Sequence, residues 1–203
     1  MNMKIIELVI DELQLDGVEA ISVVENPAIE ENFVALKSQE VKFKKQAGDK
    51  KILMGPILIP NKPIFRVSGE DEYYIYFSRD TVKRASELYL QAGNQSQSTL
   101  EHEMKLQGLT LVESWIVEDK ANDKSNVYDM DVPVGTWMGA VKVNNDEIWN
   151  DYVKTGKVKG FSIEGYFADK AEAPKEAVEE NLSSEDLMVK QLINIIKESD
   201  NEQ

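Results

Sequence analysis

Cysteine is absent from this chain of 203 residues, and histidine occurs only once. The absence of cysteine excludes disulfides, thiolate-bound zinc and cysteine nucleophiles together. A single histidine, and carboxylates at no recognisable loop spacing, make a metal site improbable on chemical grounds. No glycine-rich loop of the kind that holds phosphate is visible either. We therefore expect no metal and no cofactor.

Basic side chains are scarce relative to acidic ones, with 23 Lys and Arg against 37 Asp and Glu and a net charge of -14. This balance argues against nucleic acid or an anionic membrane surface as the main partner. No apolar run follows a basic stretch at the N-terminus, and no apolar segment is long enough to cross a bilayer. Hydrophobic content of 42% is enough for a core. Together with the absence of a signal peptide and of a membrane-spanning segment, it leads us to expect a soluble, intracellular protein.

Hydrophobic periodicity predicts a chain made mostly of strands with few helices. Helical spacing is found from Ser78 to Gly93, with Ser78 or Asp80 as possible N-caps, and again over 145–156. The polar residues 94–99 are expected to form a loop. Strands are expected at 3–10, within 51–67, and at 73–77, 109–119, 135–143 and 157–167, and the segment 18–37 is interrupted at Asn26-Pro27.

Composition divides the chain into three parts. Residues 1–50 form an N-terminal segment that holds a strand and ends in an exposed connector, and 51–169 form the core. Residues 170–203 are an acidic linker followed by an amphipathic helix at about 184–198.

Ser162 lies in the middle of the alternating strand 157–167, on the face opposite Phe161 and Ile163. Most serines in such a position are ordinary sheet residues. The surrounding residues do not form the G-x-S-x-G elbow, because no helix is evident after the serine. If Ser162 is a nucleophile, it belongs to a different hydrolase design in which the serine is carried by a strand.

His102 is flanked by Glu101 and Glu103 and is either a surface residue or a general base. Imidazole titrates near neutrality and can accept a hydroxyl proton. Because it is the only histidine, any Ser–His mechanism must use His102, and a Ser-His-His arrangement within one chain is excluded.

A third group is needed to orient the imidazole. Our preferred candidate is Glu113, which a tight turn at 104–108 would bring back towards His102. Glu113 also shares a strand face with Leu109, Leu111, Trp115 and Val117, where an unpaired carboxylate would be costly to bury. Glu164 competes with it because it lies on the same strand face as Ser162, and Asp169 is a weaker candidate.

Five motifs occur in an order that resembles a known family. The chain is similar to the XkdF-like serine proteases of tailed phages, which belong with the capsid maturation (prohead) proteases. The resemblance covers about residues 18–168. The motifs are AISVVENPAIEENFVAL at 20–36, LEHE at 100–103, LVESWIVED at 111–119, GTWMGAVKV at 135–143 and VKGFSIEGYF at 158–167.

The resemblance implies an α+β fold of the herpesvirus assemblin type, a compact and mostly antiparallel β-barrel with flanking helices. It implies a strand-borne serine nucleophile, Ser162, and an upstream histidine base, His102. The third member varies among these proteases, so Glu113 stays a proposal here. Assemblin-like relatives also suggest a homodimer.

The activity implied by the resemblance is that of a serine endopeptidase inside the immature capsid, in the host cell cytoplasm. Such enzymes cut scaffold protein, segments of the major capsid protein and often themselves, through an acyl-enzyme. An alternative is a catalytically inactive scaffold or structural protein of the phage head with a protease-like fold. A small-molecule esterase or amidase is a more distant third possibility.

Overall fold

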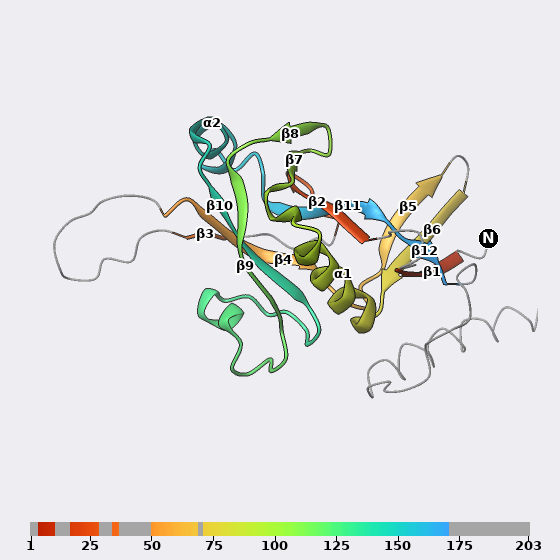
Figure 1. Cartoon of the computed structure of the whole chain (residues 1–203). Helices are drawn as coiled ribbons and strands as arrows, with labels where there is room; N and C mark the ends of the chain where they lie inside the picture. The colour runs from red at the N-terminus through yellow and green to blue at the C-terminus, as the bar shows by residue number, and fades with distance from the viewer. Residues whose placement is uncertain (1–3, 11–16, 29–33, 37–49, 69–70, 171–203) are drawn as a thin grey trace, which may run out of the picture.

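The computed structural model describes residues 4–10, 17–28, 34–36, 50–68 and 71–170. Within these ranges the chain is built from three four-stranded sheets and one long helix (Figure 1). The acidic linker, the amphipathic helix expected at 184–198 and most of the connector before residue 50 lie outside the described residues.

The three sheets have the strand orders β12-β1-β6-β5, β3-β4-β10-β9 and β11-β2-β7-β8. All pairings between these strands are antiparallel except β1 with β6 and β2 with β7. The bounds are β1 Lys4–Val9, β2 Gly17–Val24, β3 Val34–Leu36, β4 Ile52–Leu58, β5 Ile64–Ser68, β6 Asp71–Phe77, β7 Ser98–Leu100, β8 Met104–Leu106, β9 Leu109–Ile116, β10 Trp137–Val143, β11 Gly160–Tyr166 and β12 Ala168–Asp169.

Strands from the N-terminal segment pair with strands from much later in the chain. β1 lies between β6 and β12, and β2 lies between β7 and β11. Both sheets therefore depend on contacts between residues far apart in the sequence, which periodicity alone does not reveal.

Helix α1 (Arg79–Gln91) lies against β2 and β10 and follows the helical spacing predicted from Ser78. The Ser78 hydroxyl accepts a hydrogen bond from the backbone N–H of Thr81, which confirms Ser78 as the N-cap. Tyr89 is almost fully buried and its ring packs edge-on against Trp137, with centroids 5.5 Å apart. This contact joins the helix to the central strand β10.

The second predicted helix, 145–156, is present as two short pieces. α2 (Asp146–Ile148) is capped by the Asn145 side chain and continues into a π-helical turn, Trp149–Val153. Buried Ile148 and Trp149 attach this segment to the core. No helix within the described residues is long and apolar enough to span a bilayer.

β11 confirms the alternation predicted for 157–167. Phe161 is fully buried in the core, and its neighbour Ser162 is only partly buried. β2 has the matching pattern, because Val23 lies opposite Phe161 and is buried with it, and Ser22 lies opposite Ser162. One face of the β11-β2-β7-β8 sheet therefore covers the core, and the other face carries polar side chains.

The expected β-barrel is wrong for the described residues. A barrel requires every strand to be paired on both sides in one continuous register. Here each sheet has two unpaired outer strands, and β11 approaches β4 without forming a ladder with it. The architecture is mostly β with sheets that stay open, as Figure 1 shows.

The polar loop predicted at 94–99 is only partly correct. Residues 94–96 form a 3₁₀ turn, but Ser98 and Thr99 begin strand β7 and are buried. Their polarity hid a strand that forms because it pairs with Ile21 and Ser22 of β2.

The bulge at the end of β11 offers a test of this fold. The β2–β11 register shifts between Glu164 and Gly165, and a Cβ at Gly165 would lie 2.0 Å from the carbonyl oxygen of Gly17. Backbone must therefore move in Gly165→Ala, which we expect to destabilise the protein by about 1–3 kcal/mol. Urea unfolding measures this loss. Tyr166→Ala, at a neighbouring side chain that is 68% exposed, is the control. Equal stability of Gly165→Ala and wild type would contradict the close approach.

Candidate active site

Ser162 occupies the centre of β11 on the polar face of its sheet. Its side chain is partly exposed, and its hydroxyl makes no hydrogen bond within the described part of the chain. The residue directly opposite on β2 is Ser22, which is fully buried. Ser162 thus presents a hydroxyl that structural hydrogen bonds leave available.

His102 lies in the tight turn between β7 and β8, which is closed by the hydrogen bond from the Glu103 N–H to the Leu100 carbonyl. Its backbone N–H donates to the Ser22 hydroxyl over 3.1 Å. Ser22 therefore lies between the two predicted site residues. It faces Ser162 across the strand pair and holds the backbone of His102.

Glu164 is the carboxylate that lies beside the imidazole. Its Oε1 is 3.2 Å from Nδ1 of His102, and it also accepts a hydrogen bond from the Thr99 hydroxyl. The His102 and Glu164 side chains are 41% and 30% exposed. An ionised carboxylate only accepts hydrogen bonds, so Nδ1 must carry the proton, which leaves Nε2 of the neutral ring as the basic nitrogen.

Glu113, the preferred third member from the sequence, lies elsewhere. It is on β9, its side chain is 49% exposed, and it forms an ion pair with Lys124. Two local features place it there. Residues 104–106 form strand β8 in place of the expected tight turn, and a bulge leaves Val112 without a partner on β10. The bulge breaks the alternation, so Glu113 does not share the buried face of Leu109 and Leu111.

Asp169 also lies away from His102. It is on β12, opposite Leu8 of β1, and its carboxylate is 3.7 Å from the Lys4 ammonium. Among the carboxylates considered from sequence, Glu164 is thus the one that contacts the imidazole. No cluster of three or more potential metal ligands is present among the described residues.

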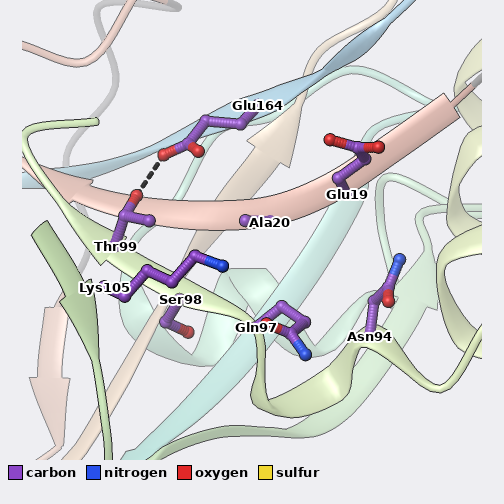
Figure 2. A pocket seen from close by; sticks show the side chains of 8 residues that line it. All are labelled: Glu19, Ala20, Asn94, Gln97, Ser98, Thr99, Lys105 and Glu164. Carbon is purple, nitrogen blue, oxygen red and sulfur yellow. Dashed lines mark hydrogen bonds between the residues drawn. The ribbon is translucent and has the colours of Figure 1, made fainter. Parts of the chain in front are cut away.

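A polar hollow of about 270 Å³ lies next to Glu164 (Figure 2). Glu164 and Thr99 meet at one end, Glu19 and Asn94 lie at the other, and the Lys105 side chain extends between them. The Glu19 carboxylate and the Lys105 ammonium form no ion pair with any described residue. The complete lining is Glu19, Ala20, Asn94, Gln97, Ser98, Thr99, Lys105 and Glu164.

Sequence reasoning missed Ser22 and Thr99. A signal for Ser22 was present, because it interrupts the apolar run Ile21–Val24 as Ser162 interrupts its own strand. Thr99 could not be recognised, since it lay in the presumed loop. Both hydroxyls are used by the candidate site, Ser22 through the His102 backbone and Thr99 through Glu164.

Comparison with known proteins places the chain in a family. A family model described as "Putative phage serine protease XkdF" matches residues 40–172, a range that contains His102, Glu113, Ser162 and Glu164. Comparisons with curated proteins and with solved structures found no significant match. Since the matched range covers more than half of the 203 residues, the chain belongs to the family of the phage serine protease XkdF.

Proposed function

We propose that this protein is a serine endopeptidase in which Ser162 is the nucleophile, His102 the general base and Glu164 the residue that orients the imidazole. The observation that carries the proposal is the contact between Nδ1 of His102 and Oε1 of Glu164, two residues beyond Ser162 on the same strand face. A serine nucleophile also agrees with the family to which the chain belongs.

The chemistry is acyl transfer. Nε2 of His102 accepts the Ser162 proton as Oγ attacks a peptide carbonyl carbon, and the same nitrogen returns that proton to the leaving amine. Water then attacks the acyl-enzyme carbonyl carbon while Nε2 takes its proton, and Nε2 returns that proton to Oγ of Ser162 as the ester bond breaks and the carboxylic acid product leaves. Glu164 keeps the imidazole in one tautomer and stabilises its cation. Contacts between nucleophile and base are often loose before substrate binds, so Ser162 and His102 need not be hydrogen-bonded in the free protein.

The proposed substrates are the scaffold protein and segments of the major capsid protein of a phage, cut inside the prohead in the host cell, with self-cleavage in addition. The family supports a phage context. The hollow beside Glu164 supports a peptide substrate, because its carboxylates, amides, hydroxyls and lysine can bind the polar groups of an extended chain.

Substitution of the nucleophile and the base gives the primary test. Wild type, Ser162→Ala and His102→Ala are each co-expressed with the neighbouring capsid and scaffold proteins, and intact masses are followed over time. We expect discrete truncations with wild type and none with either variant, because each lacks a reacting group. Unchanged masses in all three, with normal assembly, would contradict the protease and favour an inactive structural protein of the head.

Two variants that replace a carboxylate by the isosteric amide identify the third member of the proposed triad. Glu164→Gln should lower kcat by about 10²-fold or more, because an amide cannot stabilise the imidazolium and can hold the wrong tautomer. Glu113→Gln should change kcat by less than about twofold, since it alters an exposed ion pair. Steady-state cleavage of a peptide that spans a mapped site measures both. The reverse order of effects would restore Glu113 as the third member.

The pH profile tests the base. Only neutral imidazole accepts a proton. Activity should therefore decrease as the pH is lowered and the base becomes protonated. We would measure kcat/KM from about pH 5 to about pH 8, where histidine changes charge. A flat profile would argue against a histidine base.

A further inference from the structure

The turn that carries His102 has an unusual backbone. Glu101 and His102, its two central residues, have φ values of 51° and 60°. Turns of this type normally contain Asn-Gly or a similar pair, because residues with a larger side chain are strained in the left-handed region. A turn built from Glu and His needs external support to keep this conformation, and such strain tends to occur at functional sites.

The support comes from the end of β2. The His102 N–H donates to the Ser22 hydroxyl over 3.1 Å, and the Glu101 N–H donates to the Val23 carbonyl over 3.2 Å. In the opposite direction, the Glu25 N–H donates to Oε1 of Glu101 over 2.7 Å. Three hydrogen bonds thus attach the two strained residues to Ser22 and Val23 of β2 and to Glu25, which directly follows the end of that strand.

Ser22 is well suited to fix the histidine because its own orientation is fixed. Its side chain is fully buried, and its hydroxyl donates to the Thr99 carbonyl over 3.4 Å. With the proton directed to Thr99, the oxygen lone pairs are left for the His102 N–H. Ser22 also lies opposite Ser162 on the paired strand. One buried residue therefore contacts both the strand that carries the proposed nucleophile and the turn that carries the proposed base.

We propose that Ser22 and Glu101 are positioning residues, which together hold the strained turn so that the His102 imidazole faces Glu164. This inference rests on the proposed function for its effect on catalysis, but not for its effect on the turn. Without these contacts the turn relaxes to an unstrained conformation and the imidazole leaves Glu164. Neither residue lines the polar hollow, so their loss reduces kcat and leaves KM nearly unchanged.

Four variants test the proposal by kinetics. Ser22→Ala and Glu101→Ala each remove one contact, Glu101→Gln keeps an acceptor for the Glu25 N–H, and Glu103→Ala is a matched control. Glu103 is the other exposed carboxylate beside His102, and its side chain forms no hydrogen bond or ion pair with a described residue. We expect kcat to fall about 10- to 100-fold in the two contact-removing variants, because small displacements of a catalytic group have effects of this size. Glu101→Gln and Glu103→Ala should stay within about twofold of wild type.

Nuclear magnetic resonance tests the turn independently of proteolysis, since the only histidine gives a single set of ring signals. The ring ¹⁵N shifts should report a proton on Nδ1 in wild type and Glu103→Ala, and a mixture of tautomers in Ser22→Ala and Glu101→Ala. The His102 amide should also exchange faster in Ser22→Ala. Glu101→Ala serves as the deciding variant if Ser22→Ala does not fold.

The two proposals fail in different ways. Altered ring and amide signals in Ser22→Ala and Glu101→Ala, combined with a wild-type protein that cleaves nothing, would uphold the role of Ser22 and Glu101 in the turn and overturn the protease. Normal signals and normal kcat in both contact-removing variants of an active protease would overturn the positioning role. Equal loss of kcat in Glu101→Gln and Glu101→Ala would assign the effect of Glu101 to its charge and overturn its role as a hydrogen-bond acceptor.

Discussion

The pairing of β2 with β11 is the constraint on which the candidate site depends. Phe161 and Val23 are opposite one another and almost inaccessible to solvent, so their burial fixes the register of the two strands. A slip of one residue would expose both and turn Ser162 into the core. The same apolar contact that stabilises the sheet therefore sets Ser162 on the opposite face, next to the polar groups of β2 and β7. The bulge at Gly165 ends this register directly after Glu164.

Burial and exposure are divided in a way that suits reactive groups. The hydroxyl of Ser22 is fully buried, which is tolerable because it both donates and accepts a hydrogen bond. The ionisable side chains of His102 and Glu164 stay partly exposed and avoid the cost of a buried ion pair. Buried neutral residues thus fix the backbone, and the residues that could exchange protons keep contact with water.

Hydrophobic periodicity correctly predicted those strands and helices whose own sequence has one apolar face. The strand around Ser162 and the helix that begins after Ser78 have the expected patterns, because one apolar face of each is buried. The closed barrel and the turn at 104–108 were wrong because both depend on which strands pair. β7 and β8 are short, and polar Ser98 and Thr99 are strand residues because they pair with β2 on one side and β8 on the other. No spacing rule applied to one segment reveals such a partner.

The contrast between Glu164 and Glu113 has the same origin. Glu164 is two residues from Ser162 on one strand, a separation of about 6.6 Å that the strand geometry guarantees. An imidazole that forms one hydrogen bond through each ring nitrogen can join two residues at this separation, provided that one of their side chains is as long as that of glutamate. The position of Glu113 relative to His102 depended instead on a turn, a further strand and a bulge, each of which could redirect it. A carboxylate on the same strand as the proposed nucleophile, such as Glu164, is therefore the more dependable prediction from sequence. This holds even where a carboxylate on another strand, such as Glu113, has more apolar neighbours in the sequence.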